Sequence, residues 1–153
     1  MATSYDASAQ YEIKSWDVKY RRDPVRTLMA RIYQPQGDGP FPVLLDVHGG
    51  AWNDQDRTAN ALVDQQLAAS GVLVVAIDLR LASEAPYPAS VADANYGIRW
   101  LKSKAREWNG DPETLGVLGS SSGGHVVELI AMRPNDPRYN ECLSHTSGLI
   151  LSS

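Results

Sequence analysis

Short, almost uninterrupted apolar runs are the feature that most constrains the fold of this chain. Residues 42–47 (PVLLDV) and 72–77 (VLVVAI) are apolar at nearly every position, and 115–118 and 148–151 are shorter runs of the same kind. A strand that is apolar on both faces is buried on both, as in a parallel sheet covered by helices. The most apolar run has six residues, whereas a membrane-spanning helix needs about 20. We therefore expect buried strands and no membrane partner.

Segments with helical spacing lie between these runs. One stripe of apolar residues recurs at steps of three and four, at Val91, Ala94, Ile98, Leu101, Ala105 and Trp108. Such steps place side chains on one face of a helix. A shorter stripe consists of Ala59, Leu62, Val63 and Leu67. Gly71 follows it, and glycine is favoured just after a helix. We expect two helices, each with its stripe as the apolar face.

The N-terminal part of the chain has an extended pattern. Residues 11–20 and 27–33 are strand candidates, and 21–24 has the composition of a turn between them. They are expected to form an antiparallel pair at a sheet edge. The alternation of strands and helices that follows predicts an α/β fold, a mostly parallel sheet of about six strands with flanking helices. In such sheets ligands bind beyond the carboxyl ends of the strands.

Charge and cysteine content exclude several classes of protein. The chain has 14 Lys and Arg against 18 Asp and Glu, a net charge of −4, which offers no attraction for nucleic acid or an anionic membrane. Cys142 is the single cysteine, so neither an intrachain disulfide nor a multi-cysteine metal cage is available. We expect no cofactor and no metal. The first ten residues lack the basic head and apolar run of a secretory signal, so the expected location is the cytoplasm.

A serine between two glycines follows one of the predicted strands. Gly119, Ser121 and Gly123 form G-x-S-x-G after the run 115–118 and before an apolar helical segment. A serine hydroxyl is a poor nucleophile unless it is exposed, oriented and deprotonated by a neighbouring base. A sharp turn from strand to helix exposes and orients the side chain, and its strained backbone tolerates only small neighbours. The motif alone is also compatible with a flexible turn, but its place between strand and helix favours a nucleophile.

A second glycine motif follows another strand. The run 42–47 is continued by His48-Gly-Gly-Ala-Trp52. Glycines let the backbone approach a substrate carbonyl, so that N–H groups face the oxygen that becomes negative during attack. His-Gly-Gly alone is also compatible with an ordinary turn at the end of a strand. Two such motifs at strand ends, in this order, favour a catalytic site.

Together the motifs resemble those of the α/β-hydrolase superfamily. The segments that carry the resemblance are His48-Gly-Gly-Ala-Trp52, Asn109-Gly-Asp-Pro112 and Gly119-Ser-Ser-Ser-Gly-Gly124. They are most similar to the esterase and lipase branch that includes hormone-sensitive-lipase-like carboxylesterases and feruloyl-type esterases. The resemblance runs from about Tyr11 to the last residue. It implies an α/β-hydrolase fold and hydrolysis of a small-molecule carboxylic ester through an acyl-enzyme.

The resemblance also implies a role for each motif residue. Ser121 is expected to be the nucleophile. The implied oxyanion hole consists of three backbone N–H groups, those of Gly50, Ala51 and Ser122. His48 and Gly49 would support the glycine loop, and Trp52 would form a wall of the substrate pocket.

The other members of a catalytic triad are not evident. The family order is Ser, then Asp or Glu, then His. His125 follows Ser121 on the predicted helix, which runs away from the raised serine side chain, so we interpret it as structural. His145 lies in a predicted loop before 148–151. Three carboxylates near strand ends are interpreted as solvated loop charges or caps: Asp54, Asp56 and Asp78.

This gap shapes the expected organisation of the protein. We expect residues 1–153 to be the N-terminal part of a single α/β-hydrolase domain whose C-terminal strands are missing. A second polypeptide, from cleavage or separate expression, would then supply the triad acid and histidine. Two other functions stay open. Trp52 after the glycines is also similar to arylformamidase-type amide hydrolases, and the missing triad members are compatible with a catalytically degenerate binding module.

Overall fold

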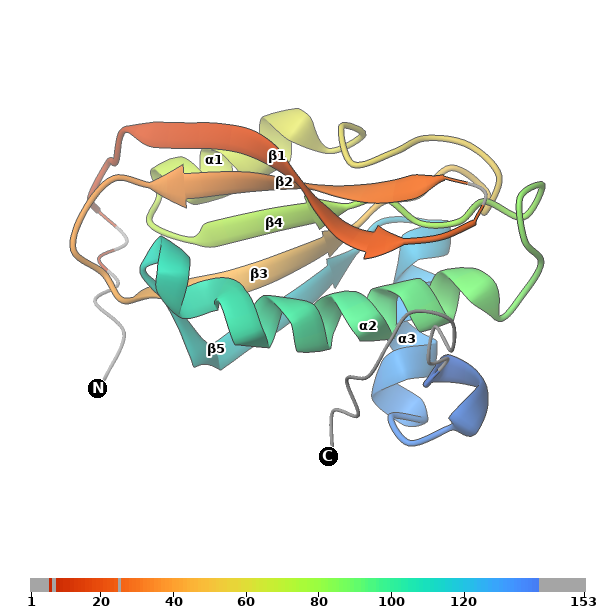
Figure 1. Ribbon diagram of the computed structural model, residues 1–153. Helices are drawn as coiled ribbons and strands as arrows, with labels where there is room; N and C mark the ends of the chain where they lie inside the picture. Colours follow the sequence, from red (N-terminus) through yellow and green to blue (C-terminus); the bar gives the residue numbers. More distant parts are fainter. Residues whose placement is uncertain (1–5, 7, 25, 141–153) are drawn as a thin grey trace.

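A five-stranded sheet runs through the residues that the computed structural model describes, which are 6, 8–24 and 26–140 (Figure 1). The strands lie in the order β1-β2-β4-β3-β5. β3 is parallel to both β4 and β5, whereas β2 is antiparallel to both β1 and β4. The strand bounds are Ile13–Arg22 (β1), Thr27–Pro35 (β2), Phe41–Val47 (β3), Leu73–Ile77 (β4) and Gly110–Gly119 (β5).

Each strand predicted within the described residues is present, with different ends. The edge pair β1 and β2 is antiparallel as expected, but β1 continues to Arg22 because a register shift between Lys19 and Arg21 lets the pairing go on. β5 starts at Gly110, ahead of its apolar run, because Gly110 also pairs with β3, opposite Phe41. The predicted strand 148–151 lies outside the described residues.

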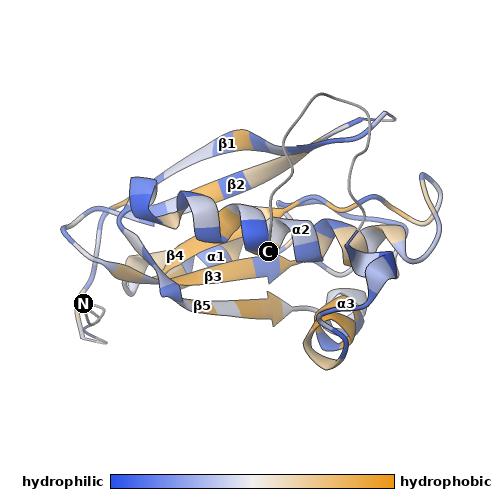
Figure 2. Cartoon of the chain, turned by 60° about the horizontal axis from the view of Figure 1, so that its bottom comes forward, coloured by the Kyte–Doolittle hydropathy of each residue, from blue (hydrophilic) through white to orange (hydrophobic). Residues whose placement is uncertain are grey.

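The larger apolar core lies on the face of the sheet that α2 and α3 cover. α2 (Ala89–Lys104) continues into a 3₁₀ turn, η1 (Ala105–Trp108), and α3 (Ser122–Met132) follows β5. A second 3₁₀ turn, η2 (Pro137–Tyr139), is held to α2 by the Asn95 side chain, whose Nδ2 donates to the Tyr139 carbonyl at 2.8 Å. Apolar side chains of β3, β4, α2 and α3 form one buried cluster. In Figure 2 the orange of apolar residues follows the three parallel strands.

α1 (Ala61–Ala69) covers the opposite face and corrects one expectation. The helix is present, and Gly71 follows it with φ of +103°. The predicted apolar face is wrong, however, because Leu62 is 77% exposed and Val63 49%. The buried side chains are Asp64 and Ala68. α1 therefore packs on the sheet through Asp64, Ala68 and the half-buried Leu67, whereas Leu62 and Val63 of the predicted stripe face away from it.

Within the described part of the chain, none of the helices combines the length and the apolar character needed to cross a bilayer.

Candidate active site

Ser121 occupies a sharp turn between β5 and α3. Its backbone has φ of 53° and ψ of −120°, a conformation that residues other than glycine rarely adopt and that is found at strained functional sites. Hydrogen bonds hold the turn on both sides of the serine. The Ser120 N–H donates to the Val47 carbonyl at 3.2 Å, and the Gly123 N–H donates to the Ser120 carbonyl at 2.8 Å. The Ser121 residue itself is exposed.

Two glycines are required by close approach at this turn. A β-carbon at Gly123 would collide with the carbonyl oxygens of Val47 and His48, so α3 can start this close to the end of β3 only with glycine there. A β-carbon at Gly49 would lie 2.8 Å from the Ser120 carbonyl oxygen and 3.0 Å from the Ser121 β-carbon. The two sequence motifs, predicted to lie at neighbouring strand ends, are therefore in direct contact.

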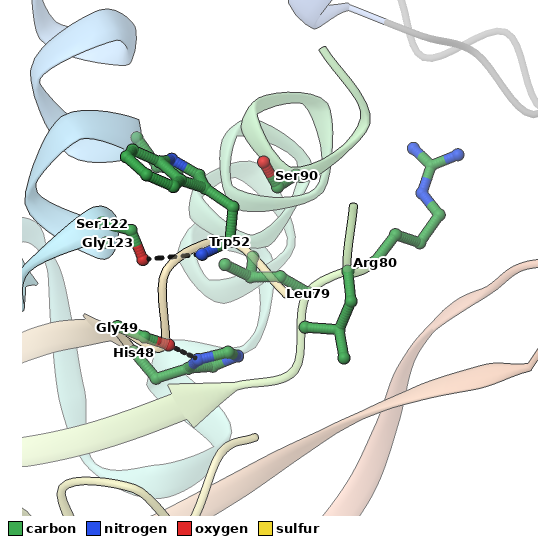
Figure 3. A pocket seen from close by; sticks show the side chains of 10 residues that line it. His48, Gly49, Trp52, Leu79, Arg80, Ser90, Ser122 and Gly123 are labelled. Atoms are coloured by element: carbon green, nitrogen blue, oxygen red, sulfur yellow. Dashed lines mark hydrogen bonds between the residues drawn. The ribbon is translucent and has the colours of Figure 1, made fainter. Parts of the chain in front are cut away.

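The glycine loop after β3 has unusual backbone geometry next to Ser121. Gly50, Ala51 and Trp52 have φ of 109°, 51° and 63°. The Trp52 N–H donates to the Ser122 hydroxyl at 3.2 Å, which ties the loop to the start of α3 (Figure 3). In the described part of the chain, the N–H groups of Gly50 and Ala51 have no hydrogen-bond partner. Ser122 is the first residue of α3, so the helix has no preceding turn whose carbonyl could accept a hydrogen bond from its N–H group.

His48 lies buried beneath this loop. Its Nδ1 is 2.6 Å from the Gly49 carbonyl oxygen. Because a carbonyl oxygen only accepts, Nδ1 must carry a hydrogen and donate it. Nε2 is buried and has no partner among the described residues. The hydrogen of the ring is therefore used in a bond to the glycine loop, which is consistent with the predicted structural role of His48.

Trp52 forms one wall of a pocket of about 340 Å³ that the start of α3 also lines. The indole is 50% exposed, and the His125 ring packs edge-on against it with ring centroids 5.7 Å apart. The pocket surface is mostly apolar, and the residues that line it with Trp52 and His125 are Ala82, Ala85, Tyr87, Ser90, Val91 and Val126. Figure 3 shows Ser122, Gly49 and His48 at the adjoining, much narrower space. An apolar chamber therefore opens between Trp52 of the glycine loop and the first turns of α3, although Ser121 itself is not among the residues that line it.

The described residues do not assemble a triad around Ser121. His48 and His125 are the histidines described, and neither forms a hydrogen bond with the Ser121 hydroxyl. His145 lies outside the described residues. Within the described part of the chain there is also no group of three His, Cys, Asp or Glu side chains placed to hold a metal ion.

The three carboxylates near strand ends differ from one another. Asp56 caps a turn, since it accepts from the N–H and the hydroxyl of Thr58 at 2.8 and 2.5 Å. In the part of the chain that is described, the Asp54 carboxylate accepts a hydrogen bond from the N–H of the next residue alone, at 2.7 Å. The expectation for Asp78 is wrong: it is 2% exposed, and neither a solvated charge nor a cap.

Asp78 is buried because it joins several segments. Its carboxylate accepts from the main-chain N–H groups of Met29 and Arg57, both at 3.1 Å. The guanidinium groups of Arg26 and Arg57 lie 3.4 and 3.3 Å from it. Hydrogen bonds and opposite charges together compensate for the loss of water around a buried carboxylate.

Sequence reasoning missed one set of residues near Ser121. Asn60, just before α1, donates from Nδ2 to the Ser120 hydroxyl at 3.0 Å and to both carboxylate oxygens of Asp46 at 3.0 and 3.1 Å. The one signal in the sequence was Asp46 itself, a charged residue inside the otherwise apolar run 42–47. A buried charge implies a partner, but the run does not say which.

The protein can now be compared with known ones. A model of the BD-FAE family matches residues 31–148. The probable carboxylic ester hydrolase LipM of Mycobacterium tuberculosis is 35% identical over 102 residues, 66% of this chain and 24% of its own. Esterase LipC of the same organism is 33% identical over 123 residues, 80% of this chain and 30% of its own.

Solved structures give the same picture. The hyperthermophilic esterase of Pyrobaculum calidifontis matches with a TM-score of 0.73 and 27% identity, covering 86% of this chain and 42% of that one. The carboxylesterase EstE1, cloned from a metagenomic library, matches with a TM-score of 0.74 and 28% identity over 87% of this chain and 46% of that one. The chain thus spans less than a third of each of these two curated relatives and under half of each of these two solved esterases.

These matches confirm the predicted resemblance, because proteins with the same fold and similar sequences are esterases. A mixed sheet with three parallel strands, a strained serine turn after β5 and a family model that covers most of the sequence agree with one another. The chain belongs to the BD-FAE family and has the α/β-hydrolase fold.

Proposed function

We propose that this protein is a serine hydrolase that cleaves carboxylic esters through an acyl-enzyme on Ser121. One observation carries the proposal: Ser121 is exposed on a strained turn in contact with the glycine loop after β3. A turn of this kind presents the hydroxyl above the sheet, where a substrate carbonyl can reach it. The names of the relatives, carboxylic ester hydrolase and esterase, support an ester as the substrate.

The proposed reaction begins with attack of the Ser121 oxygen on the ester carbonyl carbon. The carbonyl oxygen becomes negative and accepts hydrogen bonds from the N–H groups of Gly50, Ala51 and Ser122. Two of these donors have no other hydrogen-bond partner in the described part of the chain, and the third adds the positive end of the α3 dipole. The alcohol then leaves, and water releases the acid from Ser121.

The pocket and the loop beneath it have supporting roles in this proposal. Trp52 forms a wall of the apolar chamber that receives the acyl or alcohol group. His48 and Gly49 hold the glycine loop in place through the bond from Nδ1 to the Gly49 carbonyl. Because the chamber surface is mostly apolar, it favours an apolar substituent.

The reaction needs a base to take the proton of Ser121 and return it to the leaving alcohol. We propose that this histidine and its acid partner come from outside the described residues, on further chain or on a second polypeptide that completes the domain. The esterase relatives are single chains of which this chain covers less than half. Residues 1–153 would accordingly form the N-terminal part of one α/β-hydrolase domain.

Turnover of p-nitrophenyl acetate by the complete domain, with the triad histidine and its acid partner present, tests the proposal. Ser121→Ala should lower kcat by several orders of magnitude, up to about 10⁶-fold, as expected when a nucleophile is removed. Ser103→Ala, an exposed serine on α2, is the matched control and should leave turnover unchanged. Equal rates for the wild type and Ser121→Ala would refute the proposal.

The same assay separates the other two functions. An amide hydrolase of the arylformamidase type would cleave an N-formyl aryl amine faster than the ester. A degenerate binding module would cleave neither substrate above the rate in buffer.

A further inference from the structure

Two buried carboxyl groups face each other beneath the serine turn, Asp46 on β3 and Asp64 on α1. They are 1% and 0% exposed. We call them the acid pair. Neighbouring Leu45 and Val47 belong to the apolar core on the α2 and α3 face, so Asp46 points to the other side of the sheet, toward α1. The acid pair takes no part in the proposed chemistry and has no assigned role.

Only a proton can join the members of this pair. In the described part of the chain, no N–H or O–H group donates to either carboxyl oxygen of Asp64. Two buried carboxylates without a cation between them cannot both be ionised. Burial and the neighbouring Asp46 raise the pKa of Asp64 to about 8. Asp64 is therefore the member that keeps the proton, and its O–H donates to the Asp46 carboxylate.

Among the described residues, no Lys, Arg or His forms an ion pair with either member of the acid pair. From β2, the buried Tyr33 phenol faces the pair, and the charge of Asp64 contributes to the raised pKa of that phenol, after burial. From the end of β3, a charged His48 would lower the pKa of Asp46, but burial has the larger effect and raises it. The Asn60 amide, ahead of α1, also lowers the Asp46 pKa by hydrogen bonding.

Asn60 connects the acid pair to the serine turn. Its amide nitrogen lies 3.0 Å from one Asp46 oxygen and 3.0 Å from the Ser120 hydroxyl oxygen. An ionised Asp46 only accepts hydrogen bonds, so the NH₂ group of the amide must face it. Ser120 is the residue before Ser121, and its N–H and carbonyl are also bonded, to Val47 and Gly123. Every polar group of Ser120 is thus held in place.

We propose that Asp64 holds a proton at neutral pH and, through Asp46 and Asn60, positions the turn that carries Ser121. Asp64 is a positioning residue and touches no reacting atom. At alkaline pH Asp64 loses the proton, and two negative charges then face each other in a buried space. Their repulsion displaces Asp46 from its position, and Asn60 can then no longer hold both Asp46 and Ser120. The effect on rate rests on the proposed function, whereas the effect on folding does not.

The sign of the folding effect follows from the raised pKa. An aspartate in the unfolded chain titrates near pH 3.9, whereas folded Asp64 titrates at about 8. Between these values the folded state binds more protons, so stability falls as pH rises. Asp64→Asn keeps an N–H donor toward Asp46 and removes the titration. Asp38→Asn, in an exposed loop, makes the same side-chain replacement away from the acid pair and is the matched control.

The first arm of the experiment measures urea unfolding of the three proteins from pH 5 to pH 9. Relative to the wild type, the folding constant of Asp64→Asn should rise about tenfold for each pH unit between pH 5 and pH 8, or several hundredfold in all, and then level off. Asp38→Asn should show no such gain. A ratio between Asp64→Asn and the wild type that does not change with pH would overturn the proposal.

The second arm measures the rate at which a fluorophosphonate labels Ser121 over the same pH range. The wild type and Asp38→Asn should lose rate above about pH 8, where folded Asp64 titrates, and Asp64→Asn should not. A fall at alkaline pH that persists in Asp64→Asn would also overturn the proposal. If the wild type is not labelled at Ser121 at any pH, the proposed function has failed, and the unfolding arm alone decides whether Asp64 keeps its proton.

Discussion

The two faces of the sheet differ in how they are held together, and β3 shows the difference within one strand. Leu45 and Val47 lie in the apolar core against α2 and α3. Asp46, between them, faces α1 and a much smaller apolar cluster of Tyr33, Ala68, Val74 and Ala76. Apolar packing is insensitive to pH, whereas carboxyl groups titrate. The α2 and α3 face therefore holds β3 in place at any pH. On the α1 face, the proposed titration of Asp64 alters the position of the serine turn as the pH changes.

Removing apolar contacts should have the largest effect on the α2 and α3 face. Leu45→Ala, at a fully buried position, should lower the free energy of unfolding by about 2–5 kcal/mol because it leaves a cavity. Leu62→Ala on α1 is the matched control, since 77% of that residue is exposed. It should change the free energy by no more than about 0.5 kcal/mol. Urea unfolding at pH 7 measures both, and equal losses would contradict the difference between the faces.

A smaller effect on stability should distinguish Asp17 from Asp64, two carboxyl groups on the α1 side of the sheet, by its dependence on pH. Asp17 on β1 lies 2.8 Å from Arg31 and 3.1 Å from Arg57, and hydrogen bonds from these two groups hold the pKa of its carboxyl well below its usual range. Its stabilising effect is therefore present above the unfolded pKa, about 3.9, and is lost as pH falls below it. The effect of Asp64 on stability should have the opposite pH dependence, because its charged neighbour is the Asp46 carboxylate and no ion pair joins it to a cation among the described residues.

Asp17→Asn should accordingly lower the free energy of unfolding at pH 7 by about 1 kcal/mol or less, since its side chain is partly exposed. The loss should shrink toward pH 3 and in 1 M salt, which screens exposed charges. Unfolding curves at pH 3 and pH 7 measure it. A loss that grows on acidification would show that Asp17 does not titrate as its two arginine partners require.

Sequence patterns predicted the parts of this fold that depend on local residue order. The apolar runs located β3 and β4, and G-x-S-x-G located the turn between β5 and α3. In each case the residues that define the feature are adjacent in the chain, so their pattern is visible in the sequence. The prediction that this turn tolerates only small residues agrees with the structure, since Gly123 packs against the end of β3 where a β-carbon would not fit.

The sequence could not reveal features whose partners are distant in the chain. The apolar stripe of α1 predicted the wrong face, because Asp64 is buried by a partner on β3 that no spacing rule connects to it. Asp78 was misread for the same reason, since its partners include Met29 and Arg57. A carboxylate looks solvated in a sequence until the groups that surround it are known.

Mapping the adduct of a fluorophosphonate probe by mass spectrometry most directly tests the central claim, that the turn after β5 presents an activated Ser121 to the glycine loop. The account predicts that Ser121 is labelled far faster than any other serine, including its neighbours Ser120 and Ser122 and the exposed Ser103. Labelling spread evenly over exposed serines, or concentrated on a residue other than Ser121, would contradict it.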